Sequence, residues 1–197
     1  AFENQIASFK ISGLEPGRYS LSIAASDEHG VSAEPWTSVV WIEDKPFSWR
    51  DALIYQVVVD RFHHPDIPLE TGVPLSYYRG GNLTGVTEKL EAGYFKDLGV
   101  NVLWLSPLHE NADDIYVGRD NYSAQAYHGY WPRSPREVEE RFGGAEALDA
   151  LVQAAHARGI RVVMDYVLNH VHTDHPYFQN PDWFNGVDDD CICGITC

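Results

Sequence analysis

Three polar residues that follow a short apolar run are the first candidates for chemistry in this sequence. Asp165, Asn169 and His170 come directly after Val162–Met164, a run too short for a helix, which Gly159 separates from the preceding segment. In an α/β barrel, loops at the carboxyl ends of buried strands build the active site. We therefore expect a buried strand that delivers these groups to a site. A strand with a merely solvated end would show the same pattern. The rest of the chain must therefore distinguish a functional site from an ordinary strand end.

Aromatic residues provide the second group of candidates. The segment Tyr127-His-Gly-Tyr-Trp-Pro132 lies in a long loop between two apolar runs, and the chain holds 6 Trp and 11 Tyr. Flat amphipathic rings of this kind stack on sugar faces, although they also fill ordinary cores.

The elements that must position these residues alternate between strands and helices. Such alternation favours parallel β/α units, and long loops after strands with short loops after helices favour a barrel. No Gly-x-Gly-x-x-Gly follows the first strand, which argues against a dinucleotide-binding sheet. The expected strands lie at 52–59, which we expect to be buried on both faces, at 100–105 and at 162–164. The first expected helix runs from Thr87, its N-cap, to Leu98, whose side chain points inward. A second helix is expected to start at 134–137 with Ser134 as its cap, and an amphipathic helix is expected at 145–158.

The first part of the chain has a different character. Residues 6–42 read as short strands and turns, with an alternating run at Tyr19, Leu21 and Ile23 and a turn at 27–30. The sequence Leu14-Glu-Pro-Gly-Arg-Tyr19 resembles the tyrosine-corner turn of immunoglobulin-like modules. We expect residues 1–45 to be the C-terminal part of an immunoglobulin-like β-sandwich.

Composition narrows the class of partner. A formal net charge of −15 argues against nucleic acid, whose phosphates call for a basic surface. No apolar run approaches the ~20 residues of a membrane span. Cys191, Cys193 and Cys197 cannot all pair with one another, and they await other partners, bind a metal or stay free. The chain begins at Ala1 and ends at Cys197 within a polar loop, from which we expect a fragment cut at both ends.

Four segments in order resemble the α-amylase family of glycoside hydrolases. The last of them has Asp, three residues, Asn and His, which is similar to the family's first conserved segment at the end of the third barrel strand. The resemblance covers about residues 46–185, and the segments are Ile54-Tyr-Gln-Val-Val-Val-Asp-Arg-Phe62, Gly99-Val-Asn-Val-Leu-Trp-Leu-Ser-Pro107, Tyr127-His-Gly-Tyr130 and Asp165-Tyr-Val-Leu-Asn-His170.

The resemblance implies a fold and a division into domains. It implies strands 1–3 of a (β/α)8 TIM barrel, with the first β/α units at 46–170 and the start of an inserted domain at 171–197. The β-sandwich tail also fits members of the family with an N-terminal β domain. It further implies an α-glucan oligo- or polysaccharide as partner, and for such an enzyme with clustered cysteines we expect a secreted or extracytoplasmic location. The sequence is silent on the oligomeric state.

The resemblance also implies roles for individual residues. Tyr130 would stack on the sugar ring beside the cleaved bond, and His128 and His170 would bind its hydroxyl groups. Asp165 would orient neighbours in the floor of the site. Asn169 would offer its carbonyl oxygen to a structural calcium, which prefers hard oxygen ligands.

The catalytic carboxylates of the family are expected outside this chain. The retaining mechanism needs a nucleophile and an acid roughly 5–5.5 Å apart, and the resemblance places these groups on later strands, beyond Cys197. The fragment itself is therefore expected to be inactive, and transglycosylation or isomerisation by the parent enzyme stays open.

Two other functions remain open at this point. A non-catalytic homologue with the same barrel would bind glucan or serve as a partner subunit. A zinc-dependent hydrolase of the amidohydrolase type would use His170 and His172 with Asp174 and His175 nearby. That pattern resembles the first strand of its family, whereas here it ends the third, and a solvated loop is the favoured interpretation of the last three residues. The acidic run at 188–190 is expected to be solvated, and Asp60 with Arg61 to form a structural ion pair.

Overall fold

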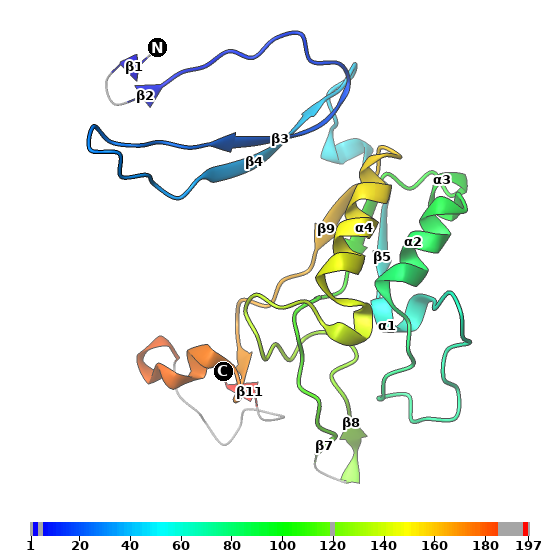
Figure 1. Ribbon diagram of the computed structural model, residues 1–197. Helices are drawn as coiled ribbons and strands as arrows, with labels where there is room; N and C mark the ends of the chain where they lie inside the picture. Colours follow the sequence, from blue (N-terminus) through cyan, green and yellow to red (C-terminus); the bar gives the residue numbers. More distant parts are fainter. Residues whose placement is uncertain (1, 4–5, 119–120, 185–194, 197) are drawn as a thin grey trace. The chain divides into compact units, whose positions relative to one another are not determined.

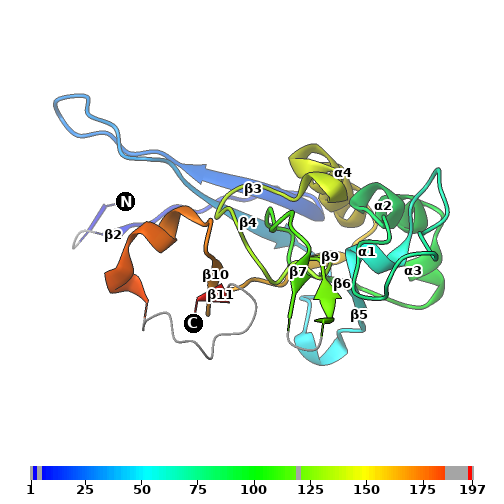
Figure 2. The ribbon, with the colours of Figure 1, turned by 90° about the horizontal axis from the view of Figure 1, so that it is seen from below.

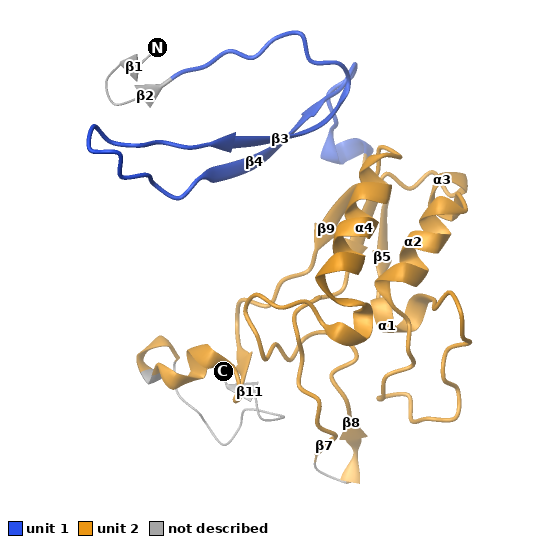
Figure 3. Ribbon diagram, in the orientation of Figure 1, with its two compact units in different colours: residues 1–51 blue, residues 52–197 orange. Residues whose placement is uncertain are grey.

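The computed structural model describes residues 2–3, 6–118, 121–184 and 195–196 of the chain. The chain divides into two compact units, residues 1–51 and 52–197 (Figure 3). The three cysteines and the acidic run at 188–190 lie outside the described residues, so the expectations for them stay predictions.

Unit 1 is built around one antiparallel hairpin of β3 (Gly17–Ile23) and β4 (Trp36–Ile42). The register pairs Tyr19 with Val40 and Ile23 with Trp36, so apolar residues share one face. At the turn, Oδ1 of Asp27 accepts from the backbone N–H groups of residues 29 and 31. Among residues 8–51, no side chain is buried. The unit also contains the short pair β1 (Phe2–Glu3) and β2 (Ile6–Ala7), and a 3₁₀ turn, η1 (Trp49–Asp51).

Unit 2 contains a parallel sheet of three strands in the order β5-β6-β9 (Figure 1). The strands are β5 (Ile54–Val57), β6 (Val102–Leu105) and β9 (Arg161–Met164). The three strands end at the same level, because Val57 pairs with Leu105 and Leu105 with Met164. Parallel β/α units are therefore confirmed, and their loops leave from one end of the sheet.

Three of the helices of unit 2 cover one face of this sheet (Figures 1 and 2). They are α2 (Leu83–Glu91), α3 (Tyr94–Asp97) and α4 (Gly144–His156), which confirms the amphipathic helix predicted at 145–158. The hydrophobic core lies between sheet and helices, and its fully buried side chains include Val57, Leu83, Val86, Leu90, Phe95, Leu103, Leu105, Phe142, Leu151 and Ala155.

The prediction of a strand at 52–59 buried on both faces was wrong in two respects. The strand is shorter, and the short helix α1 (Val59–Phe62) follows it. One face of the sheet is also open: Ile54 on β5 is 48% exposed, and Trp104 on β6, which lies on the same face, is 37% exposed. The helices cover only the other face, which leaves these apolar side chains in contact with solvent.

The helix predicted at 87–98 is also different. The cap is Asn82, whose Oδ1 accepts from the backbone N–H of Gly85 at 2.7 Å, and not Thr87. The helix breaks at Gly93, whose φ of 86° lies in the left-handed region. Leu98 is 49% exposed and does not point into the core.

The predicted helix start at 134–137 was wrong. This segment is not helical: Glu110 donates its backbone N–H to the carbonyl of Glu137 at 2.9 Å, and Val138 forms a bridge with His109. Pairing with the chain after β6 therefore replaces the local cap. A 3₁₀ turn, η3 (Glu140–Phe142), leads into α4.

Short elements complete unit 2. The pair β7 (Tyr116–Val117) and β8 (Ser123–Ala124) lies in the loop after β6, and β10 (Val171–His172) pairs with β11 (Ile195–Thr196). Two 3₁₀ turns, η4 (Pro176–Gln179) and η5 (Pro181–Trp183), follow β10. Within the described part of the chain, no helix has the length and apolar character needed to cross a membrane.

Candidate functional site

Side chains from two separate segments meet beyond the carboxyl end of β9. The hydroxyl of Tyr130, from the loop between β6 and α4, donates to Oδ2 of Asp165 at 2.6 Å. The ring of His170 reaches back to the same loop, with Nε2 lying 2.8 Å from the carbonyl oxygen of Tyr130. The structure thus brings together Tyr130, Asp165 and His170, which the sequence had placed up to 40 residues apart.

The fourth predicted residue, His128, lies against the same tyrosine. Its Nδ1 accepts from the backbone N–H of Tyr130 at 2.9 Å, and the two rings stack with centroids 5.6 Å apart. Because Nδ1 accepts, a neutral His128 carries its proton on Nε2. Burial, with the positive charge of Arg61 and the ring of His170, lowers the pKa of His128 to about 4. The imidazole is therefore neutral near pH 7.

The ring of Tyr130 combines a fixed hydroxyl with an accessible face. The bond to Asp165, followed by burial and the charge of that carboxylate, raises the pKa of the Tyr130 phenol to about 12. The residue is 39% exposed, so the ring is available to a ligand. A flat, accessible ring beside a carboxylate and two imidazoles is suited to a polyhydroxylated ligand such as a sugar.

The loop that carries these groups passes very close to the end of β6. Gly129 has a φ of 85°, and a Cβ atom built there would lie 2.1 Å from the carbonyl oxygen of Pro107. Only glycine fits this approach, so the turn between His128 and Tyr130 is defined by its sequence.

Asp60 and Arg61 support the other side of the loop. They form an ion pair, as predicted, and the carboxylate of Asp60 also accepts from the backbone N–H groups of Arg79 and Gly80 at 2.9 to 3.0 Å. The guanidinium carbon of Arg61 lies 3.6 Å from the centre of the Tyr127 ring. The pair therefore has a structural role that includes support for the segment containing His128.

Asn169 lies beside the site with its side chain exposed. Its Nδ2 contacts Nδ1 of His170 at 3.4 Å, so the amide oxygen points elsewhere. This oxygen is one ligand of the kind that calcium takes. Across the residues that the structure describes, no group of three or more His, Cys, Asp or Glu is placed to hold a metal. Within the described residues, Asn169 is therefore not joined by a ready-made group of His, Cys, Asp or Glu ligands.

The same finding bears on the zinc hypothesis. His172 and Asp174 contact each other at 3.5 Å, while His175 is buried and its Nδ1 accepts from the backbone N–H of Tyr177 at 3.1 Å. These side chains do not join His170 in a ligand cluster within the described residues.

A hollow of about 250 Å³ lies next to the site. Its lining includes Asn169 and His170, together with His109, Tyr166, His175 and Trp183.

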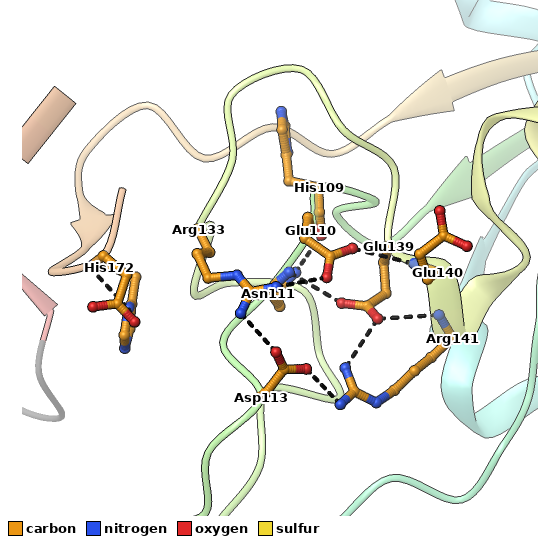
Figure 4. A network of polar contacts seen from close by, with 10 residues as sticks. His109, Glu110, Asn111, Asp113, Arg133, Glu139, Glu140, Arg141 and His172 are labelled. Carbon is orange, nitrogen blue, oxygen red and sulfur yellow. Dashed lines mark hydrogen bonds and ion pairs between the residues drawn. The ribbon is translucent and has the colours of Figure 1, made fainter. Parts of the chain in front are cut away.

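A polar network at the base of the site loop was missed in the sequence (Figure 4). The network joins the chain after β6 to the chain before α4: Arg133 pairs with Glu110 at 3.0 Å and Asp113 at 2.6 Å, and Arg141 with Asp113 at 2.6 Å and Glu139 at 3.1 Å. Glu139 is completely buried. Glu137 and Glu140, which lie close to it in the sequence, are charged too. The sequence pattern therefore gives no sign that Glu139 is buried while its neighbours are not.

Comparison with known proteins places most of the chain in one family. Residues 19–183 match the family described as "Alpha amylase, catalytic domain". A cyclomaltodextrin glucanotransferase of Paenibacillus macerans is 34% identical over 77% of this chain and 22% of its own length. The periplasmic alpha-amylase of Escherichia coli K12 is 34% identical over 64% of this chain and 20% of its own.

A solved structure agrees with the sequence comparison. The alpha-amylase of Geobacillus thermoleovorans, complexed with acarbose, superimposes with a TM-score of 0.59 at 35% identity, covering 73% of this chain and 29% of that protein. This chain thus spans between a fifth and a third of the relatives named here. The similarity identifies the three-stranded parallel sheet as part of a TIM barrel.

Proposed function

Because this chain belongs to the α-amylase family of glycoside hydrolases, we propose that it supplies the sugar-binding part of an enzyme that acts on α-glucosidic linkages of starch-type glucans. The observation that carries this proposal is the meeting of Tyr130, His128, Asp165 and His170 at the carboxyl end of the sheet. In a TIM barrel this end is where substrates bind.

Each of these residues has a proposed role that its geometry supports. The exposed ring of Tyr130 stacks on a glucose ring, and Asp165 holds the tyrosine through its hydroxyl. Neutral His128 offers its Nε2 proton to a sugar hydroxyl. Both ring nitrogens of His170 already have neighbours, so a hydroxyl that binds there must replace one of them. The 3.4 Å contact with Asn169 is the weaker of the two.

The reaction proposed for the full-length protein is the retaining one. A carboxylate attacks the anomeric carbon while a carboxylic acid protonates the leaving oxygen, and water then releases the sugar from the covalent intermediate. We assign none of these catalytic roles to residues of this chain. Its contribution is to bind and orient the sugar beside the nucleophile and the acid of later strands. Transfer of the glycosyl group to a sugar acceptor instead of water would use the same binding groups of this chain.

A structural calcium is also proposed, with Asn169 as one ligand. The support is its exposed amide oxygen beside the site, and because the described residues form no group of three or more His, Cys, Asp or Glu there, most of the remaining ligands have to come from other groups. The ion would fix the segment after His170, and no chemical step is assigned to it.

Two proposals concern the rest of the chain. For unit 1, we propose the end of an immunoglobulin-like β-sandwich, because Tyr19 donates its hydroxyl to the carbonyl of Glu15 at 2.9 Å, as in a tyrosine corner. A crystal structure of the full-length protein with the apolar face of the hairpin in solvent would contradict this. We also propose a secreted or extracytoplasmic location, which cell fractionation would test.

The deciding experiment separates binding from turnover. Maltoheptaose and acarbose are titrated calorimetrically into the full-length protein, and soluble starch is then incubated with it while NMR follows the configuration of the first products. Binding with release of α-configured ends supports a retaining enzyme. Binding without turnover supports a non-catalytic glucan-binding homologue, and the absence of binding overturns the proposal.

A further inference from the structure

We propose that Asn111, held by the buried carboxylate of Glu139, is a positioning residue that fixes Tyr130 in the sugar site. The inference rests on the proposed function, because it concerns how the sugar-binding ring is held. Neither residue lies among the groups expected to contact a sugar. Their part follows from the hydrogen bonds around one peptide group.

That peptide group joins Tyr130 to Trp131. Its carbonyl oxygen lies 2.8 Å from Nε2 of His170, and its N–H donates to Oδ1 of Asn111 at 2.8 Å. The peptide plane is thus bonded from both sides, by the segment after β9 and by the segment after β6. Since Cα of Tyr130 is attached to this plane, the direction of the tyrosine ring depends on it.

The orientation of the Asn111 side chain is itself fixed by its surroundings. The residue is completely buried, and its Nδ2 donates to the carbonyl of His109 at 2.5 Å, so its Oδ1 must face Trp131. Its backbone N–H donates to Oε2 of Glu139 at 3.0 Å. The side-chain amide therefore has one orientation, because exchanging its oxygen and nitrogen would turn the oxygen toward the carbonyl of His109 and the nitrogen toward the N–H of Trp131.

Glu139 explains why this arrangement is rigid. It is completely buried, and its other oxygen, Oε1, accepts from the backbone N–H and the guanidinium of Arg141, both at 3.1 Å. A buried carboxylate must keep such partners, because the loss of any of them leaves a charge without compensation. A movement of Asn111 away from Trp131 would disturb this network (Figure 4).

A double-mutant cycle on sugar binding tests the proposal in the full-length protein. Asn111→Ala removes the bond to Trp131, and we expect the dissociation constant for acarbose to rise about tenfold. In a Tyr130→Ala background the same change should have less than a twofold effect, because the ring that it positions is gone. A purely structural role would weaken binding equally in both backgrounds, and that result would overturn the proposal.

A matched control separates positioning from general loss of stability. Oδ1 of Asn101 accepts from the backbone N–H of Leu53 at 2.8 Å at the opposite end of the sheet. Asn101→Ala removes a bond of the same type and should leave acarbose affinity within twofold of wild type. An equal loss of affinity in the Asn101 and Asn111 variants would also overturn the proposal.

A conservative variant covers the case in which Asn111→Ala does not fold. Asn111→Asp keeps the acceptor for Trp131. Burial and the nearby carboxylate of Glu139 favour the protonated form of the new carboxyl group, which then keeps a donor for the carbonyl of His109. The backbone amide signal of Trp131 can be followed by NMR. We expect an unshifted Trp131 amide and acarbose affinity within threefold of wild type, whereas a tenfold loss with an unshifted amide would count against the proposal. If the wild-type protein does not bind acarbose, the proposed function is wrong. If the wild type binds and only the variants behave differently from expectation, the positioning role of Asn111 is wrong.

Discussion

The hydroxyl of Tyr130 donates a 2.6 Å hydrogen bond to Oδ2 of Asp165, a residue that lies 35 positions further along the chain. The bond joins the loop after the second strand of the sheet to the first residue after the third. It fixes the phenol while the residue stays 39% exposed. The site therefore has a ring that is both held in place and open to a ligand, which is the arrangement that stacking on a sugar requires.

Substitutions at Tyr130 can measure separately what the hydroxyl bond to Asp165 and the exposed ring contribute. Tyr130→Phe removes the bond to Asp165 and keeps the ring, so we expect acarbose affinity within about threefold of wild type and a loss of roughly 1 kcal/mol of stability. Tyr130→Ala removes the ring and should weaken binding by about 10- to 100-fold, or roughly 1.4 to 2.7 kcal/mol. Titration calorimetry and thermal denaturation provide the two readouts.

A surface tyrosine in the same loop serves as the control for this pair. Tyr122 is 62% exposed, and Tyr122→Ala should leave acarbose affinity unchanged. If Tyr130→Phe lost as much affinity as Tyr130→Ala, the hydroxyl and not the ring would carry the binding, and the stacking role would be wrong.

The pKa of His128 predicts how stability depends on pH. Burial, with Arg61 and His170, lowers this pKa from 6.5 in the unfolded chain to about 4. Between these values the unfolded state binds the proton and the folded state does not. Stability is therefore full above pH 6.5 and falls as the pH drops toward 4, by about 3 kcal/mol at most.

The variant His128→Gln should flatten this part of the profile, because glutamine does not titrate. At pH 7.5 His128 is neutral in both states, so the stability difference between wild type and variant measures the packing and hydrogen bonding of the neutral ring. The change in that difference on going to pH 4.5 isolates the effect of the proton. An imidazole signal of His128 that titrates near 6.5 in NMR would contradict the prediction.

The sequence predicted the parallel sheet and the site better than it predicted the elements between them. Short apolar runs bounded by polar residues located β5, β6 and β9 because a buried parallel strand has few other possible patterns. The site residues followed from their places after these strands and from the resemblance to a known family. Their roles in binding stay predictions.

The errors arose where contacts between distant residues overrode local signals. The segment 134–137 has the composition of a helix cap, but backbone hydrogen bonds to Glu110 at both of its ends replace a helical turn. Leu98 fits a helical stripe only if the helix continues through Gly93, where it breaks. Glu139 and Asn111 could not be found at all, because burial of polar residues has no periodic signal in the sequence.

Calcium should stabilise the protein through Asn169 if the proposed ligand is correct. An ion that binds only the folded state adds about 2.7 kcal/mol at 100 times its dissociation constant, which corresponds to a rise of several degrees in melting temperature. Calcium chloride at millimolar concentration should produce this rise, and Asn169→Ala should remove it. Scanning calorimetry measures both.

Magnesium chloride at the same concentration controls for charge screening, because Mg²⁺ demands a tighter octahedral geometry. Equal shifts with both salts, or a calcium shift that persists in Asn169→Ala, would show that this amide is not a ligand.

Gly129 provides the sharpest test of how the site loop is packed. Alanine there meets two penalties: a φ of 85°, and a Cβ position 2.1 Å from the carbonyl oxygen of Pro107. The loop must move away from β6 to accommodate the methyl group, which takes His128 and Tyr130 with it. We expect Gly129→Ala to lose roughly 3 kcal/mol of stability or more and to bind acarbose at least about tenfold more weakly.

Gly93→Ala is the matched control, because Gly93, between α2 and α3, has a φ of 86° and no atom lies within 4 Å of the position that a Cβ would take there. It carries the backbone strain alone, at a cost of about 1 to 2 kcal/mol, and leaves the sugar site in place. The difference between the two variants therefore reports the contact with Pro107. Equal stability losses, or an intact acarbose affinity in Gly129→Ala, would show that the loop can shift without displacing Tyr130.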